Sequence, residues 1–251
     1  MTKISSSFMA SKQEICLRRP GRNDLAIMSI AVGNPPLTLL HPSEKERYLQ
    51  LQTPARRNSF LLGRCAAKTA LSGLTPHVAP AAINIAKGVF NFPVVYGIGM
   101  DNLQVSISHS PPFAIAIAFS EAHPLGIDIE KIKVANGDLL RRVMSPWEVD
   151  LTSQLGLDAS IGNTVIWSAR EALSKIIRTG LSAGFDLLRV QSMVYYEQAL
   201  LLSFVNFPQY KAIVIIENSY VFSLVIPAGT GIDIVTWQKD VSAGAGLLLF
   251  Y

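Results

Sequence analysis

Charged residues are scarce in this sequence of 251 residues, at 16% against 49% hydrophobic residues. The mean hydropathy is +0.32. Such a composition excludes an intrinsically disordered chain, which needs many charges and few apolar residues. Long apolar runs are also lacking, since the longest, around residues 113–119, is broken by Ser120 and Glu121. It falls short of the roughly 18 residues that a membrane-spanning helix requires. We therefore expect a folded chain without a membrane span.

Cysteine is equally sparse. Cys16 and Cys65 are too few for a disulfide framework, and neither stands in a metal-ligand spacing. None of the four histidines pairs with another at such a spacing, and no Gly-x-Ser-x-Gly elbow of a serine hydrolase is present. The first residues lack the continuous apolar segment of a secretory signal. These absences favour a reducing, cytoplasmic location.

Basic residues outnumber acidic ones by 22 to 18, a net charge of +4. Six of them gather around the first predicted helix: Lys45, Arg47, Arg56, Arg57, Arg64 and Lys68. A row of fixed cations suits a multiply phosphorylated ligand, although a solvated helix face is an equal alternative. Nucleic acid is a rival partner, but the cluster has no interleaved aromatic residues and matches no nucleic-acid-binding module.

Hydrophobic periodicity predicts a mixture of helices and strands. Helices are expected at 54–72, at 139–151 with an interruption near Ser145, and at 164–178. Short β-type runs are expected at 105–108, 113–119, 125–129, 188–196, 199–205, 212–216 and 220–226. We therefore predict an α+β fold of two similar halves, residues 1–122 and 123–251, each an antiparallel sheet packed with a long helix.

An acidic pair lies in the predicted strand Gly126-Ile127-Asp128-Ile129-Glu130. Because alternate side chains of a strand share a face, Asp128 and Glu130 are expected to point the same way while the isoleucines are buried. Two carboxylates on one face suit Mg²⁺, which prefers oxygen ligands. The alternative is a half-exposed strand with a solvated acidic face. A similar string at 231–235 ends in valine and is interpreted as structural.

A second constellation lies in the predicted helix Trp167-Ser168-Ala169-Arg170-Glu171-Ala172-Leu173-Ser174-Lys175. Positions four apart share one stripe of a helix, so Trp167, Glu171 and Lys175 align. Glu171 can complete an acidic cation site, and Lys175 can neutralise a phosphate beside it. The alternative is an ordinary Glu–Lys pair on the helix surface. His109, in a polar turn that ends the strand Val105-Ser106-Ile107-Ser108, can donate to a phosphate or simply be exposed to solvent.

The order SISHS, GIDIE and WSAREALSK resembles the signature of the 4′-phosphopantetheinyl transferase superfamily. The length and the upstream helix FLLGRCAAKTAL make the chain similar to the Sfp/EntD type. The resemblance runs from about Lys45 to Lys175. It implies a pseudo-twofold monomer with an active site between its halves. The implied activity, of holo-[acyl-carrier-protein] synthase type, moves the phosphopantetheine arm of coenzyme A onto a serine of a carrier protein and releases 3′,5′-ADP.

The resemblance also implies a role for individual residues. Asp128, Glu130 and Glu171 match the Mg²⁺ ligands, and Glu171 is in addition the general base. Lys175 contacts the diphosphate, and Ser108 and His109 lie near the phosphates of coenzyme A, with His109 also assisting the transfer. Lys45 and Arg57 match residues that hold the 3′-phosphate, and Arg64 matches the Gly-Arg of the first helix. Ser145 and Glu148 match a Phe-Ser-x-x-Glu stretch.

The sequence departs from the family pattern at two places. Arg170 stands where lysine is usual, and Lys87–Pro93 lacks the usual tight Gly-Lys-Pro. Two other functions stay open: a Mg²⁺-dependent phosphodiesterase or pyrophosphatase, and a non-catalytic protein that binds a carrier protein or nucleic acid. On the favoured interpretation the partners are an acidic carrier protein, steered by charge, and coenzyme A, with no nucleic acid and no membrane.

Overall fold

The computed structural model describes residues 8–99, 102–133 and 140–246. Its contacts divide the chain into two compact units. The N-terminal unit holds the described residues of 1–15, 25–122 and 242–251, and the C-terminal unit holds 16–24 and 123–241. The expected halves 1–122 and 123–251 stay a prediction, and these units differ from them in two segments. Residues 16–24 group with the C-terminal unit and residues 242–251 with the N-terminal one.

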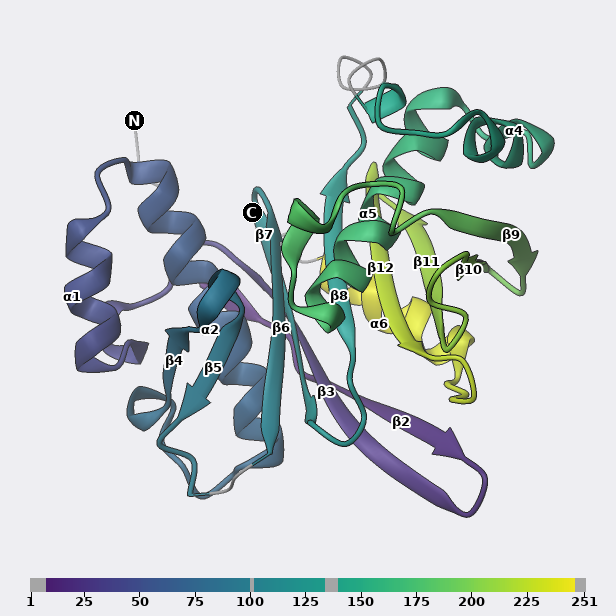
Figure 1. Ribbon diagram of the computed structural model, residues 1–251. Helices are drawn as coiled ribbons and strands as arrows, with labels where there is room; N and C mark the ends of the chain where they lie inside the picture. The colour runs from purple at the N-terminus through teal and green to yellow at the C-terminus, as the bar shows by residue number, and fades with distance from the viewer. Residues whose placement is uncertain (1–7, 100–101, 134–139, 247–251) are drawn as a thin grey trace. The chain divides into compact units, whose positions relative to one another are not determined.

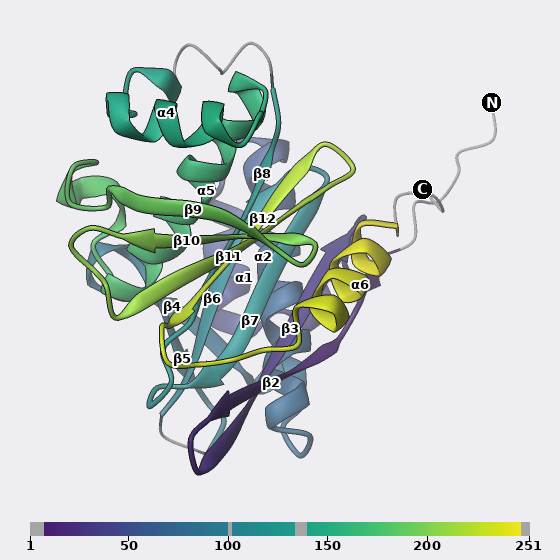
Figure 2. The same ribbon diagram turned by 90° about the vertical axis from the view of Figure 1, so that its right-hand side faces the viewer.

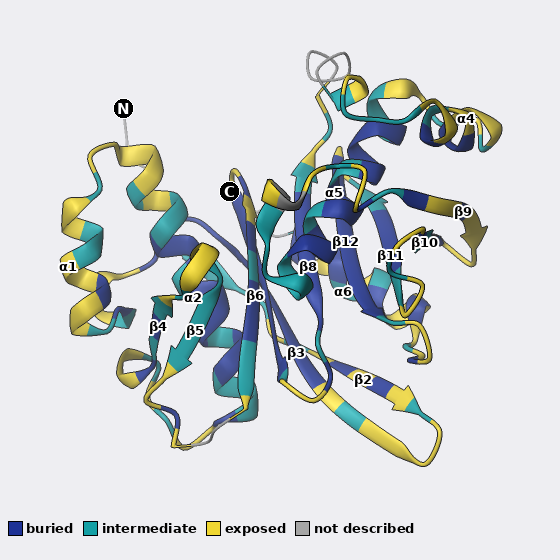
Figure 3. Cartoon of the chain, viewed as in Figure 1, coloured by how far each residue is buried: buried dark blue, intermediate teal, exposed yellow. Residues whose placement is uncertain are grey.

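A five-stranded sheet forms the centre of the N-terminal unit (Figure 1). Its strands are β1 (Met9–Ala10), β2 (Gln13–Arg19), β3 (Arg22–Val32), β6 (Leu103–Ser110) and β7 (Phe113–Ser120), although residues 16–24 of β2 and β3 group with the C-terminal unit. The order is β1-β3-β7-β6, with β2 also paired to β3. Helix α2 (Pro54–Leu74) packs on β7 and β6 through a face of small and aliphatic side chains. Nearly all of β7 is buried, so it is the central strand of this core (Figure 3).

Two smaller elements complete the N-terminal unit. Helix α1 (Pro42–Gln50) begins with a capping box in which His41 and Glu44 bind each other's backbone groups. Strands β4 (Asn84–Lys87) and β5 (Pro93–Tyr96) form a hairpin whose turn holds the short 3₁₀ segment η3 (Val89–Asn91). This hairpin contacts both α1 and β6, so its turn lies beside the ends of α2 and β6.

The C-terminal unit is built on a second antiparallel sheet, in the order β8-β12-β11-β10-β9 (Figure 2). The strands are β8 (Gly126–Lys131), β9 (Val190–Tyr196), β10 (Ala199–Phe204), β11 (Tyr210–Glu217) and β12 (Tyr220–Pro227). Helix α5 (Ala159–Ile177) packs against β8, β12 and β11, and α4 (Pro146–Gln154) packs against α5 and β9. The helix α5 thus covers the sheet face that carries the acidic strand.

Each strand expected from periodicity is present, with ends that differ by a few residues. Helix α5 begins at Ala159, before the expected start at 164. Of the expected helix at 139–151, α4 covers the part from Pro146, after the expected interruption, and residue 139 lies outside the described residues. The sequence did not indicate α1, the β2–β3 hairpin, the β4–β5 hairpin or α6 (Ile234–Ala245). Residues 231–235, interpreted as structural, lead into α6: Asp233 accepts a hydrogen bond from the backbone N–H of Thr236 at 2.9 Å and so caps that helix. In the described part of the chain, no helix combines the length and the hydropathy needed to cross a membrane.

Candidate functional site

Strand β8, which carries the acidic pair, and helix α5 approach each other closely at Gly126. A Cβ atom at this position would lie 2.0 Å from the backbone oxygen of Ala172 on α5. Only glycine leaves room for that approach. The first residue of Gly-Ile-Asp-Ile-Glu therefore sets the separation between β8 and α5. Since Gly126, Asp128 and Glu130 share one face of the strand, the same approach brings α5 to both carboxylates.

Asp128 is held by two side chains of α5. One carboxylate oxygen accepts from Ser168 Oγ at 2.8 Å, and the other accepts from Lys175 Nζ at 2.7 Å. Lys175 also donates to the backbone oxygen of Ile127 at 2.8 Å. Asp128 is only 2% exposed, so the alternative of a solvated face does not hold for this carboxylate, whereas Glu130 is partly exposed. Burial of this carboxylate is tolerated because it is paired and hydrogen-bonded.

Glu130 and Glu171 extend the acidic region along the same helix. Trp167 Nε1 donates to Glu130 Oε1 at 3.2 Å, so Trp167 and Lys175 reach the strand from one stripe of α5, as their spacing predicted. Burial, and next the charge of Asp128, raise the pKa of Glu130 to about 7. Burial and the charge of Asp128 also raise the pKa of Glu171. The three carboxylates are therefore close enough to repel one another.

These three carboxylates fit a hard divalent cation by their chemistry, because they are oxygen ligands whose mutual repulsion a cation relieves. The described residues contain no group of three or more His, Cys, Asp or Glu side chains placed closely enough to hold a metal ion. Asp128 is paired instead with the ammonium of Lys175. The three-ligand metal set thus stays a prediction, and it requires Lys175 to release one oxygen of Asp128.

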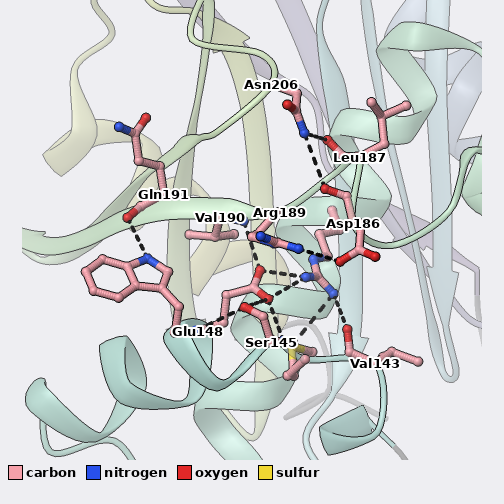
Figure 4. A network of polar contacts seen from close by, with 12 residues as sticks. Val143, Ser145, Glu148, Asp186, Leu187, Arg189, Val190, Gln191 and Asn206 are labelled. Atoms are coloured by element: carbon pink, nitrogen blue, oxygen red, sulfur yellow. Dashed lines mark hydrogen bonds and ion pairs between the residues drawn. The ribbon is translucent and has the colours of Figure 1, made fainter.

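Arg170, one of the two departures from the family pattern, pairs with the buried Glu148 and not with the acidic region. Figure 4 shows the polar network around Glu148. Arg170 donates to both carboxylate oxygens of Glu148 at 2.6 Å and to the backbone oxygen of Val143 at 2.8 Å. Glu148 also accepts from the backbone N–H groups of Ser145 and Val190, each at 2.9 Å. The network joins α4, α5 and β9, and so fixes the helix that carries Glu171 and Lys175.

A separate cavity of about 460 Å³ lies in the N-terminal unit. Its walls come from the start of α2, the end of α1, the turn of the β4–β5 hairpin and the end of β6. The charged and polar side chains that line it are Arg47, Arg56, Ser59, Arg64, Lys87, Asn91 and His109. The clustering of basic residues in the sequence indicated this site, and two predicted ligand-binding residues, Arg64 and His109, lie in its wall.

The cations of this cavity repel one another. Arg47 and Arg64 both lie over the ring of Phe60, with guanidinium carbons 5.8 and 4.8 Å from its centroid. Burial and the charges of Arg47 and Arg64 lower the pKa of Lys87. Burial lowers the pKa of Arg64 to about 10, against the opposing effect of Glu44. An anion placed here would gain from several cations at once.

Other predicted cations lie elsewhere among the described residues. Lys68 is 1% exposed and pairs with Glu44 at 2.6 Å, while it donates to backbone oxygens of Leu39 and Ile83. It therefore ties α2 to its neighbours and does not face the cavity. Lys45 is exposed outside the cavity wall, and Arg57 Nε donates to the backbone oxygen of Leu51 at 2.7 Å. Ser108 is buried in β6 and does not line the cavity either.

Comparison with known proteins finds similarity to one family over part of the chain. A family model for the 4′-phosphopantetheinyl transferase superfamily matches residues 124–225, which include β8, α5 and the second sheet. The resemblance is thus confirmed for the segment that holds GIDIE and WSAREALSK, whereas SISHS, at residues 106–110, lies outside the matched segment.

Individual relatives point in the same direction. The chain is 32% identical to enterobactin synthase component D of Escherichia coli (strain K12) over 142 residues, which are 55% of this chain and 64% of the relative. The same values hold for the protein of that name from Shigella flexneri. It is 31% identical to a 4′-phosphopantetheinyl transferase of Bacillus subtilis over 113 residues, 45% of this chain and 49% of the relative. The chain therefore matches less than two thirds of the length of these relatives.

Proposed function

We propose that this protein is a 4′-phosphopantetheinyl transferase that moves the phosphopantetheine arm of coenzyme A onto a serine of an apo carrier protein. The observation that carries the proposal is the pairing of Asp128 with Lys175, with Glu130 and Glu171 alongside, between β8 and α5. It lies inside the segment that matches the family. The names of the relatives support the same reaction class.

In the proposed reaction the serine hydroxyl attacks the phosphorus that carries the pantetheine arm. A new P–O bond to the serine forms, the bond to the bridging diphosphate oxygen breaks, and 3′,5′-ADP leaves. Glu171, whose raised pKa makes it a better proton acceptor than an ordinary glutamate, takes the hydroxyl proton. Lys175 moves from Asp128 to the diphosphate and balances the charge that develops on its oxygens.

Asp128, Glu130 and Glu171 are the residues proposed to hold Mg²⁺. When bound, the ion would supply Lewis-acid stabilisation of the phosphate oxygens. Ser168 orients Asp128 from the side opposite Lys175. Trp167 donates to Glu130 and limits the directions in which that carboxylate can turn.

The basic cavity of the N-terminal unit is proposed to bind the phosphorylated nucleotide end of coenzyme A. Arg47, Arg56, Arg64 and Lys87 offer fixed positive charge there, and His109 lies in the same wall. Lys45 and Arg57, which were predicted to hold the 3′-phosphate, do not line this cavity. Arg47 and Arg56 do line it, so they are the better candidates to hold the 3′-phosphate. Ser108 is retained as a residue near the phosphates.

Three finer properties belong to the same proposal. The protein is a monomer of pseudo-twofold symmetry, it works in the cytoplasm, and it resembles the Sfp/EntD type more than a holo-acyl-carrier-protein synthase, because of its length and relatives. Its partner is a carrier protein with an acidic surface, attracted by the net charge of +4. Light scattering across a range of protein concentrations tests the monomer, since a dimer would double the measured mass.

The assay that tests the proposal follows release of 3′,5′-ADP with and without an apo carrier protein. Release that requires the carrier supports a transferase, whereas release from coenzyme A alone indicates a pyrophosphatase or phosphodiesterase. Replacing Asp128 by alanine should abolish transfer while the melting curve stays normal. Asp150, exposed on α4, is the matched control, and Asp150→Ala should leave transfer unchanged.

A further inference from the structure

One buried hydroxyl in the C-terminal unit, that of Ser223, has no hydrogen-bond partner among the described residues. It lies next to Asp128, a residue that the proposed mechanism uses. Ser223 lies in β12 with 0% of its surface exposed, and its Oγ has no hydrogen-bond partner within the described part of the chain. A buried polar group left unpaired costs about 1–3 kcal/mol, so a strand position of this kind ordinarily takes an apolar residue. The hydroxyl therefore needs an explanation other than stability.

Ser223 lies directly opposite Asp128 across the β8–β12 ladder. Paired residues of antiparallel strands point to the same face, and their Cβ atoms lie about 4.5–5.5 Å apart. Both side chains therefore face α5, the helix that supplies Ser168 and Lys175. Figure 1 shows α5 lying over β8 and β12. A serine hydroxyl and an aspartate carboxylate at that separation can form a hydrogen bond by rotation of the two side chains, without movement of the backbone.

Ser168 and Lys175, which both donate to Asp128, differ in how easily they can leave. Ser168 is completely buried and its Oγ stays beside the strand, whereas the side chain of Lys175 is 23% exposed. A cation that binds Asp128 competes directly with the Lys175 ammonium for the same oxygen. Once Lys175 departs, Asp128 keeps one side-chain donor from α5 and gains freedom to rotate away from the other acidic residues.

We propose that Ser223 is a positioning residue that donates to Asp128 after Lys175 has released it. The inference rests on the proposed function, because the displacement of Lys175 follows from it. Ser223 touches neither substrate nor the reacting atoms in this account. It fixes the orientation of Asp128 in the ligand-bound state, and its unpaired hydroxyl in the unliganded state is the cost of that role.

The N-terminal unit offers a matched control. Ser29 in β3 is also 0% exposed, and its Oγ also lacks a partner among the described residues, but it faces Ala116 across the ladder instead of a carboxylate. Removing either hydroxyl should leave the protein as stable as before or slightly more stable. Only the loss of the Ser223 hydroxyl should change the response to a cation.

The experiment measures the melting temperature during a Mg²⁺ titration at saturating coenzyme A, for the wild type, Ser223→Ala, Ser223→Thr and Ser29→Ala. We expect Ser223→Ala to need about tenfold more Mg²⁺ for half of the thermal shift, the effect of one charge-assisted hydrogen bond. Ser29→Ala should match the wild type. Ser223→Thr, which keeps the hydroxyl, should recover most of the affinity.

Three results would overturn the inference. If Ser223→Ala responds to Mg²⁺ like the wild type, or if Ser29→Ala loses affinity equally, Ser223 has no positioning role, although the proposed function would stand. If the wild type shows no Mg²⁺-dependent shift with coenzyme A, the proposed function fails and the inference fails with it. The melting temperature without Mg²⁺ separates these results from a folding defect.

Discussion

One terminal nitrogen of Arg170 donates to both carboxylate oxygens of Glu148 at 2.6 Å, and both side chains are completely buried. The pair joins the helix that carries Glu171 to the helix before it. Arginine suits this place better than lysine, because a second terminal nitrogen reaches the backbone oxygen of Val143. The departure from the family pattern thus concerns the support of α5.

Breaking this pair should be costly, since it leaves a buried charge unpaired. We expect Arg170→Met to lower the free energy of unfolding by about 3–5 kcal/mol, measured by urea denaturation. Arg170→Lys keeps the charge but loses the second donor, and should cost less. Arg189→Lys is the control, because its pair with Asp186 is exposed and should change stability by under about 1 kcal/mol. Equal losses for Arg170→Met and Arg189→Lys would contradict the account of the network.

Gly126 should tolerate no side chain. Its Cβ would collide with the Ala172 backbone oxygen, so Gly126→Ala must separate β8 from α5. We expect a loss of several kcal/mol in the free energy of unfolding, of the size seen for overpacked cores or more. Gly229→Ala is the control, because nothing lies within 4 Å of a Cβ there. A Gly126→Ala protein with unchanged stability would show that the close approach is not as described.

Because of Asp24, the free energy of unfolding should depend on pH in the acidic range. The hydrogen bond with His123, and then those from Arg19 and Arg22, lower the pKa of Asp24 from 3.8 to about 2, against the effect of burial. His123 also lies 2.8 Å from Thr230, so this group ties three segments of the C-terminal unit together. Because the folded pKa is depressed, the stability from Asp24 is complete above about pH 4 and is lost as the pH falls toward 2.

Equilibrium denaturation between pH 2 and 5 checks that dependence. Asp24→Asn should be less stable than the wild type at pH 5, and the difference should shrink as the pH approaches 2. The exposed Asp150→Asn serves for comparison. A constant difference between Asp24→Asn and the wild type across this range would contradict the depressed pKa.

The two cysteines should differ in reactivity. Burial raises the pKa of the Cys65 thiol to about 12, and its side chain is inaccessible, whereas Cys16 is exposed on β2. Alkylation with iodoacetamide at pH 8 should therefore modify one thiol per native chain and two in denaturant. Cys16→Ser should leave no reactive thiol in the native protein. Rapid native labelling of Cys65 would show that α2 is less well packed than described.

The sequence predicted the acidic strand correctly because both of its patterns are local. A period of two placed Asp128 and Glu130 on one face, and a period of four aligned Trp167 with Lys175. The structure brings these two patterns together, with Lys175 on Asp128 and Trp167 on Glu130. The depth of burial, the role of Ser168 and the unpaired Ser223 depend on how α5 packs, which periodicity does not specify.

Two further outcomes were not specified by the sequence patterns. Gly-Ile-Asp-Ile forms a strand at residues 126–129, yet at 231–234 it leads into a helix, because Asp233 caps the N–H of Thr236. Lys68 was grouped with the phosphate-binding cations by helical spacing, but Glu44, far away in sequence, neutralises it. The pairing of Lys68 joins two elements, and the periodicity of one helix carries no information about it. The Asp233 cap is local, but a strand period does not reveal it.

The central claim is that a serine of a carrier protein accepts the phosphopantetheine arm. Intact-mass spectrometry of a panel of apo carrier proteins, each incubated with this protein, coenzyme A and Mg²⁺, tests it most directly. The account predicts that at least one carrier gains the mass of a single phosphopantetheine, that replacing its acceptor serine by alanine prevents the gain, and that Lys175→Ala slows it while the exposed Lys239→Ala does not. Carriers that stay unmodified while coenzyme A is hydrolysed, or that bind the protein without any change in mass, would contradict it.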